Sequence, residues 1–542
     1  MVQKTSRSLA GIAGIVAVAT LISKVFGLVR EQAIAAAFGV GPVVNAYAYA
    51  YVIPGFLLIL LGGINGPFHS ALVSVLAKRD KEEAAPIVET VSTLVSALLI
   101  GVAVLLVICA PLLIDLLAPG LDADTRTLAI LQLRIMSPLA VLAGLIGIGF
   151  GTLNAADQYW LPSISPLFSS TVLIVSVGGL ILLLGDQVAA PESVRLGGMV
   201  LASATLAGGV WQWLAQVVVQ WRLGLGSLRL RLNWRLPGVQ AVLRVMLPAT
   251  LSSGMLHINV YTDLFFASAI AGAAAAMRYA NFIVLTPVGI LSNMILVPFL
   301  PVFSRLTTPE QWPELKLRIR QGLLLTALTM LPLTAIFMSL SVPIIRLIYE
   351  RFAFDETASQ LVAPVLMAYG FGMFFYLGRD VLVRVFYALG DGETPFRVSI
   401  ANILLNGVLD YLLVNAFQTP GLVMATIGVN VVSMVIFLGL LHRRLQGLPL
   451  WEWGGLFLWL LLSSVAAGGA SWGVSWAWEQ YLGHDHLLLL LGQLFTGSAI
   501  ALVIFVGLVR PLRLPELKML QQILIAAWEK MQQLRRRQRG YK

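Results

Sequence analysis

The chain has 542 residues, of which 58% are hydrophobic and 11% charged, and its mean hydropathy is +0.87. A soluble protein of this length could not bury so much apolar surface, so these values exclude a soluble fold and indicate a polytopic membrane protein. The formal net charge of +10 is spread over loops and a C-terminal tail, without the compact basic patch of a nucleic-acid binder.

Apolar runs long enough to cross a bilayer, which takes roughly 20 helical residues, recur fourteen times along the chain. We therefore predict an all-α fold with two pseudo-symmetric lobes of six helices each and a C-terminal helix pair. The expected spans of the first lobe are 9–37, 44–77, 86–117, 127–152, 161–185 and 196–222. Those of the second lobe are 239–271, 275–305, 317–348, 359–389, 395–417 and 421–445, and the final pair is 453–480 and 486–512.

These spans divide the chain into four predicted parts. The first lobe occupies residues 1–225, the second 226–446 and the helix pair 447–513, and a basic amphipathic tail at 514–542 is expected on the cytoplasmic side.

Two short stretches look like copies of one helix-turn-helix element. Residues 151–162 and 386–395 lie about 233 positions apart, and each ends an apolar run, turns around an Asp (Asp157 or Asp391) and restarts at a Pro. An internal duplication of membrane spans is typical of transporters.

The distribution of Lys and Arg orients the chain, because these residues stay on the cytoplasmic side near span ends. They gather before the first span, in alternate loops and in the tail. We therefore expect an even number of spans and both termini in the cytoplasm.

The sequence contains no catalytic motif, so we expect a transporter and not an enzyme. It has one cysteine, Cys109, which rules out an internal disulfide or a Cys metal cluster. The only metal-like cluster, residues 484–486, falls in a predicted external loop, where a solvated polar turn is the better interpretation.

Ionisable residues inside spans are costly, so they are the candidates for function. Lys24, Arg30 and Glu31 fall in the first span. Arg30 and Glu31 are neighbours that point in different directions on a helix and need not pair, whereas Lys24 lies on nearly the same face as Glu31. Cations here would suit an anionic substrate such as a lipid phosphate; the alternative is a purely structural role.

A second candidate group lies in the second lobe. Asn406 and Asp410 are spaced i, i+4 and share a helix face, and Asp263 and Thr426 could converge on them. Four oxygen-bearing side chains around one buried point would suit a hard monovalent cation. The alternative is polar contact between helices.

Together these motifs resemble the MurJ (MviN) lipid II flippase family of the multidrug/oligosaccharidyl-lipid/polysaccharide exporter superfamily. The similarity extends over roughly residues 10–445. The stretches that carry it are 23–31, 36–39, 66–71 and 386–391 with Thr394 and Pro395.

The resemblance implies a multi-pass protein of the bacterial plasma (inner) membrane that moves lipid II outward by alternating access, for peptidoglycan synthesis and cell shape. It implies a cationic cavity for the pyrophosphate of lipid II, to which Lys24, Arg30 and Glu31 would contribute, and a groove for the isoprenoid tail at the last two helices. It also implies that Asp263, Asn406, Asp410 and Thr426 are the ligands of a candidate sodium site, with no other cofactor. Cell-wall synthesis proteins are candidate partners.

Several residues depart from the family pattern, and Lys24 replaces one of its arginines. Val52 and Phe282 stand where the family has cavity arginines, and Arg278, one turn before Phe282, is a candidate replacement cation. These departures leave open another isoprenoid-pyrophosphate-linked glycan, of O-antigen or capsule type, as the cargo. A cation-coupled drug antiporter of the same superfamily is a further alternative.

Overall fold

The computed structural model describes residues 9–63, 66–77, 79–254, 258–483 and 486–520. Within these ranges the chain forms α-helices, short 3₁₀ turns and one isolated β-bridge between Arg351 and Phe354. The predicted all-α membrane fold is thereby confirmed.

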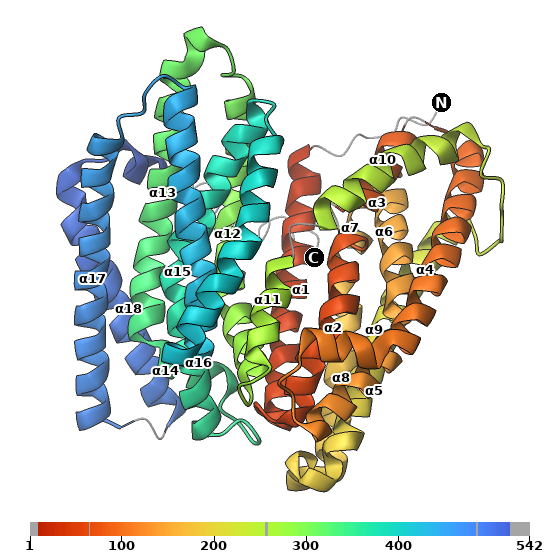
Figure 1. Ribbon diagram of the computed structural model, residues 1–542, viewed down its shortest axis with the longest axis horizontal. Coiled ribbons are helices and arrows are strands. Elements are labelled where there is room, and N and C mark those ends of the chain that lie inside the picture. Colours follow the sequence, from red (N-terminus) through yellow and green to blue (C-terminus); the bar gives the residue numbers. More distant parts are fainter. Residues whose placement is uncertain (1–8, 64–65, 78, 255–257, 484–485, 521–542) are drawn as a thin grey trace, which may run out of the picture. The chain divides into compact units, whose positions relative to one another are not determined.

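The chain divides into two compact units, which are described separately. The first contains Met1–Ala275 together with Arg351–Asp355. Its helices, red to yellow-green in Figure 1, are α1 (Leu9–Phe38), α2 (Pro42–Leu60), α3 (Pro67–Leu76), α4 (Lys81–Leu117), α5 (Ala123–Met136), α6 (Leu139–Ala155), α7 (Trp160–Ile164), α8 (Pro166–Leu184), α9 (Val194–Arg222), α10 (Pro237–Gly254) and α11 (Ile258–Ala267).

The second unit contains Ala276–Glu350 and Glu356–Lys542. Its helices, green to blue in Figure 1, are α12 (Ala273–Ser304, which begins just before the unit does), α13 (Trp312–Ser339), α14 (Ser341–Tyr349), α15 (Glu356–Ala388), α16 (Glu393–Arg444), α17 (Leu450–Tyr481) and α18 (Leu487–Val509).

Polar side chains join the helices inside the first unit. The Gln132 amide of α5 donates to the carbonyl oxygens of Val43 on α2 and Gly198 on α9, at 3.4 and 3.2 Å. The hydroxyls of Tyr47 and Thr205 meet at 3.0 Å. In an apolar solvent such bonds hold helices together where the hydrophobic effect between them is weak.

The boundary between the compact units differs from the predicted lobe boundary at 225/226. It falls after Ala275, because α10 packs on α3 and α4, and α11 also packs on α4. Contacts along these helices were not visible in the hydropathy pattern. The division by internal repeat therefore stays a prediction.

Ten helices of the described residues are long and apolar enough to cross a membrane, or eleven if the α5–α6 pair, bent by 41°, is one span. Part of the difference from the predicted fourteen lies at α16, which passes as one helix although Gln418 interrupts it. The rest lies at α1 and at the α10–α11 pair. The count of fourteen stays a prediction.

The backbone repeats in the two halves of the chain. Three residues with positive φ, namely Gly39, Asp157 and Gly185, are followed 233 positions later by three more, Gly272, Gly390 and Gln418. Gly185 and Gln418 also share ψ, at −131° and −130°. The duplication predicted from two short motifs is therefore also present in the backbone.

The repeat also refines the comparison of the two Asp turns. The amide of Gln158 donates to the Leu153 carbonyl at 2.9 Å, and the amide of Asp391 donates to the Phe386 carbonyl at the same distance. Both helices thus end in a Schellman-type turn. Asp157 corresponds to Gly390 and not to Asp391, so the shared element is the turn and not the carboxylate.

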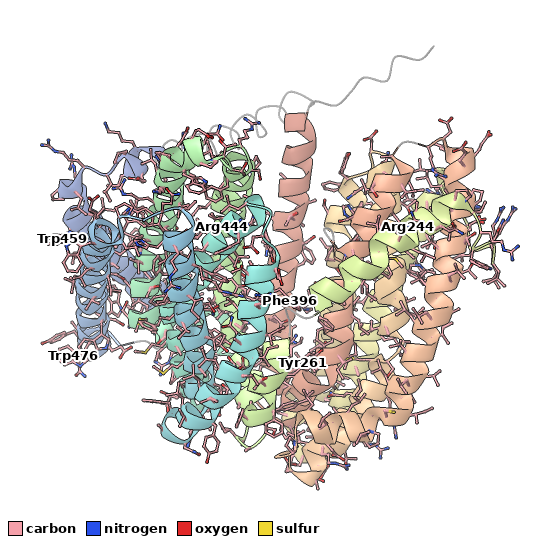
Figure 2. All side chains as sticks on the ribbon, turned by 45° about the horizontal axis from the view of Figure 1, so that its top comes forward. Arg244, Tyr261, Phe396, Arg444, Trp459 and Trp476 are labelled. Carbon is pink, nitrogen blue, oxygen red and sulfur yellow. The ribbon has the colours of Figure 1, made fainter. Side chains whose placement is uncertain are left out.

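Exposed aromatic side chains gather toward both ends of α17, with Trp451 and Trp459 near its start and Trp472, Trp476 and Tyr481 near its end. Trp459 and Trp476 are 47% and 54% exposed, and both lie on the outer side of the helix in Figure 2. Their separation of 17 residues corresponds to about 26 Å along the axis, close to the ~30 Å hydrocarbon core. This spacing is typical of the aromatic belts at the two surfaces of a bilayer.

Candidate functional site

The cationic residues of the first span lie on α1, in the first unit. Lys24 is exposed, whereas Arg30 is partly covered and donates through Nε and Nη2 to Glu31 Oε1, at 3.1 and 2.8 Å. The expectation that these neighbours need not pair is therefore corrected. The long arginine side chain folds back along the helix and reaches the carboxylate.

This pair has a defined electrostatic consequence. The Glu31 side chain is 1% exposed, and the Arg30 side chain is 26% exposed. Removal of Arg30 would leave a buried acidic side chain without its cation, which is strongly unfavourable. The exposed part of the guanidinium remains accessible to an anion.

A polar contact fixes α1 directly beside Lys24. The Ser23 hydroxyl donates to the Ser163 carbonyl oxygen of α7 at 3.1 Å. Just after α7, the Ser165 hydroxyl accepts bonds from the amides of Gln212 and Gln216 on α9, each at 3.3 Å. α1 is thus linked through α7 to α9 at the residue that precedes Lys24, which limits the rotation of α1.

The second candidate group lies on α16. Gln418 has φ 52° and ψ −130°, which interrupts the helix, and Asn406 and Thr426 meet from the two sides of this break. The Asn406 amide donates to Asp410 Oδ2 at 2.7 Å, and the Thr426 hydroxyl donates to Asn406 Oδ1 at 3.4 Å. Asn406 and Asp410 are fully buried.

The oxygen atoms of this group fit a small hard cation. A carboxylate, an amide carbonyl and a hydroxyl come together on two helical segments, and such oxygens are preferred by alkali and alkaline-earth ions. Asp263, the fourth predicted ligand, lies on α11 in the other compact unit. The three residues of α16 are therefore the part of the predicted set that is brought together within one unit.

Comparison with known proteins decides the family. A family model described as lipid II flippase MurJ matches residues 34–492. The chain is also 62% identical to a probable lipid II flippase MurJ of Synechocystis sp., over 98% of this chain and 99% of that protein. The chain belongs to the lipid II flippase MurJ family. As members of this family are transporters, the chain is not an enzyme.

More distant MurJ proteins and solved structures agree. The lipid II flippase MurJ of Burkholderia cenocepacia is 28% identical, over 80% of this chain and 84% of that protein. A structure of lipid II flippase MurJ in an inward closed conformation has a TM-score of 0.73 at 21% identity and covers 92% of this chain and 99% of that one. An inward-facing multidrug resistance transporter of the MATE family and MOP superfamily has a TM-score of 0.57 at 17% identity, covering 80% and 98%. These structures share the fold.

Two of the positions that depart from the MurJ pattern lie on helices of different units. Val52 is in α2 and Phe282 in α12, and both are partly buried. Arg278 also lies on α12, one turn before Phe282, and is itself partly buried. Arg278 thus places a cation on the same helix as Phe282, four residues earlier in the chain.

The polar group on α16 extends further than the sequence analysis expected. The Asn430 amide donates to the Thr426 carbonyl at 3.0 Å, and Arg379 of α15 donates through Nη1 to Asn430 Oδ1 at 3.4 Å. A continuous series of hydrogen bonds therefore joins Arg379 to Asp410. The spacing of Asn406 with Asp410 and of Thr426 with Asn430, four residues in each case, is the sequence signal that would have found it.

Other predicted features stay predictions, because much of the chain that carries them lies outside the described residues. Among the described residues, no three His, Cys, Asp or Glu side chains form a group that could hold a metal ion. His484 and Asp485 and the tail beyond residue 520 lie outside the described residues. Cys109 lies on α4 as a partly buried free thiol.

Polar contacts also hold the final helix pair, α17 and α18, in place. The Ser464 hydroxyl donates to the Leu331 carbonyl of α13 at 2.7 Å, and the Ser339 hydroxyl donates to that of Ser471 at 2.9 Å. The Gln493 amide joins α18 to the Ser475 hydroxyl of α17 at 2.8 Å. These two helices are therefore a fixed part of the second unit.

Proposed function

We propose that the chain translocates lipid II across the bacterial plasma membrane, with Lys24 and Arg30 of α1 binding its pyrophosphate. The chain is a lipid II flippase that supplies precursor for peptidoglycan. The observation that carries the role of α1 is the pairing of Arg30 with a buried carboxylate beside an exposed lysine. Arg30 stays charged, oriented and partly open to an anion.

The two cations of α1 act differently on a phosphate. Arg30 offers planar, directed N–H groups, part of which already bind Glu31. Lys24 is a compact charge that binds phosphate without a fixed geometry. Translocation proceeds by alternating access, from the cytoplasmic to the outer face, with both termini in the cytoplasm.

The test is complementation in a bacterium in which the native flippase is depleted. Depletion should leave lipid II on the cytoplasmic face and cause lysis. The wild-type chain should restore lipid II on the outer face, and Arg30→Ala should not. Arg126→Ala is the matched control, because Arg126 pairs with Asp115 on the exposed surface. Full restoration by Arg30→Ala would contradict the role of α1, and failure of the wild-type chain would contradict the function itself.

We further propose that Asn406, Asp410 and Thr426, which meet within the second unit, bind a sodium ion. A bound sodium would neutralise the buried carboxylate and link transport to the sodium gradient. If so, the purified wild-type protein should unfold at a higher temperature in sodium chloride than in choline chloride. Asp410→Asn should lose this difference and Asp391→Asn should keep it, since Asp391 lies in the turn before α16. An equal response to both salts in the wild type would refute sodium binding.

One observation favours a second cargo. The resemblance implies that Val52 and Phe282 stand where the family has arginines, and a site with fewer cations would bind a pyrophosphate less strongly and leave more of the recognition to the glycan. Another isoprenoid-pyrophosphate-linked glycan is therefore the alternative. The protein is reconstituted in vesicles that contain either lipid II or such a glycan lipid, and the appearance of each lipid on the opposite leaflet is measured. The lipid that the protein moves across the bilayer is its cargo.

A further inference from the structure

An unusual surface lies between α9 and α10. Residues 227–235, which we call the Arg-Leu ribbon, form neither helix nor paired strand, and large apolar and basic side chains alternate along them. The apolar members are Leu228, Leu230, Leu232 and Trp234, and the basic members are Arg229, Arg231 and Arg235. The connection appears in yellow-green beside α4 in Figure 1.

The ribbon is attached to α4 by a buried carboxylate. The amide and hydroxyl of Ser227 donate to Glu89 Oε1 at 2.9 and 2.6 Å, and Arg231 Nε lies 2.6 Å from Glu89 Oε2. The Arg231 amide also donates to the Thr93 hydroxyl at 3.2 Å. Glu89 is 4% exposed, and both of its carboxylate oxygens contact the ribbon. It therefore holds the ribbon in one position.

The attachment determines which side of the ribbon faces outward. In extended chain, alternate side chains point to opposite sides, and Ser227 and Arg231 point toward α4. Leu228, Leu230 and Leu232 therefore point away from α4, and Leu230 is the most exposed of them at 86%. Trp234, in the turn at the end of the ribbon, is 57% exposed. Arg235 stacks on the Trp234 ring with its guanidinium carbon 5.5 Å from the centroid. Such a row of exposed leucines is stable only against an apolar partner.

The position of the ribbon along α4 identifies that partner. Exposed large apolar residues on α4 run from Leu98 to Leu116, about 27 Å at ~1.5 Å per residue, which matches the hydrocarbon core. Thr93 lies five residues before Leu98, or about 8 Å along the axis. The ribbon therefore lies at the edge of the lipid-facing band, at the depth of the headgroups.

We propose that the Arg-Leu ribbon binds anionic phospholipid at the membrane surface. The leucines and Trp234 enter the boundary of the acyl chains, and Arg229 and Arg235 bind headgroup phosphates. In the described residues neither of these two arginines has an ion pair with a carboxylate, so their charges are available to lipid. The proposal requires that the chain spans a membrane, and it is independent of the cargo.

The entry of the leucines into the boundary of the acyl chains is tested with single-cysteine proteins. Because Cys109 is the only cysteine, Cys109→Ser gives a thiol-free background. Leu230→Cys, Leu232→Cys, Arg229→Cys and Asn233→Cys each receive a nitroxide, and the proteins are reconstituted in phosphatidylcholine vesicles containing phosphatidylglycerol. Nitroxides at 230 and 232 should be accessible to oxygen and shielded from a water-soluble nickel complex. Nitroxides at 229 and 233 should be accessible to the nickel complex and less accessible to oxygen. Equal nickel accessibility at all four positions would overturn the proposal.

The binding of headgroup phosphates by the arginines is tested by lipid retention. Arg229→Gln with Arg235→Gln should weaken phosphatidylglycerol binding, measured by native mass spectrometry, about fivefold per arginine, since each cation near the surface contributes ~1 kcal/mol. Phosphatidylcholine binding should not change. Arg195→Gln, at the opposite end of α9, is the control and should behave as the wild type. Equal phosphatidylglycerol binding by the double variant and the control would exclude the arginines as the lipid contacts.

Discussion

Asp391 illustrates how one side chain determines a turn between two helices. Its Oδ1 accepts the Thr394 amide at 2.9 Å, and its Oδ2 accepts the Thr394 hydroxyl at 2.8 Å and Arg444 Nη1 at 2.6 Å. Arg444 lies near the end of α16 (Figure 2). Partial burial raises the pKa of Asp391, but these bonds from Thr394 and Arg444 outweigh it and hold the pKa below its ordinary value. The ionised carboxylate therefore ties both ends of α16.

Replacement of this carboxylate should give a pH-dependent loss of stability. Because the pKa is lowered in the folded protein, the stabilisation is present above the unfolded pKa of about 3.9 and is lost as the pH falls through the folded pKa. Asp391→Asn should cost about 0.2–1 kcal/mol at pH 7, because it removes the ion pair with Arg444, and the stability difference between the variant and the wild type should disappear in acid. Thermal unfolding of the detergent-solubilised protein across this pH range measures both.

Asp157 provides the comparison for that experiment. It lies in the equivalent turn of the first unit, where its carboxylate accepts one bond, from the Tyr159 hydroxyl at 3.2 Å. Asp157→Asn should therefore change the unfolding temperature less than Asp391→Asn. Equal changes in unfolding temperature for the two variants would mean that the contacts of Asp391 with Arg444 and Thr394 contribute little to stability.

The candidate residues could be chosen from the sequence, but their partners could not. A lysine and an arginine in an apolar run can be chosen from the sequence, because a charged side chain inside a membrane span is costly and suggests a function. Whether Arg30 turns back to Glu31 depends on rotamers and on the helices around α1, because neighbouring residues on a helix point about 100° apart. For the same reason the sequence did not reveal that Arg379 binds Asn430.

At the scale of elements, the helical break in α16 occurs at a strained residue. Gln418 adopts φ 52° and ψ −130°, a combination that favours glycine, and the equivalent residue of the first half is Gly185. A side chain at such a position costs of order 1 kcal/mol. The same turn is thus built with strain in one half and without it in the other.

This asymmetry predicts two opposite effects. Gln418→Gly should raise the thermal unfolding temperature by relieving about 1 kcal/mol of backbone strain, since the exposed glutamine side chain loses few contacts. Gly185→Gln should lower the temperature by a similar amount, because a Cβ there meets no atom within 4 Å and only the backbone penalty remains. A lower unfolding temperature for Gln418→Gly would show that the side chain contributes more than its conformation costs.

Hydropathy predicted where helices lie more successfully than where they break. The predicted span 44–77 contains two helices, α2 and α3, and 317–348 contains α13 and α14. A sliding average of apolar character stays high through a bend, because the residues at the bend are apolar too. Breaks depend on backbone angles and on contacts from other helices, which composition does not report.

At the scale of the whole molecule, the arrangement of Lys and Arg predicts the sides on which loops lie. With both termini in the cytoplasm, a green fluorescent protein fused after the C-terminus should be fluorescent in the bacterial host. Alkaline phosphatase fused after Gly120, between α4 and α5, should be active, because that connection is expected outside. Activity of a phosphatase fused after Gly224, in a predicted cytoplasmic loop, would contradict this topology.

The equal spacing of the positive-φ residues limits how the two halves can have changed. From Gly39 to Asp157 there are as many residues as from Gly272 to Gly390, and the next interval, to Gly185 and to Gln418, is also equal. Side chains have diverged freely in these intervals, but no net residue has been gained or lost. One added residue would turn every following side chain by about 100° and expose polar faces to lipid. In this chain, segment length has been inherited more strictly than amino-acid identity.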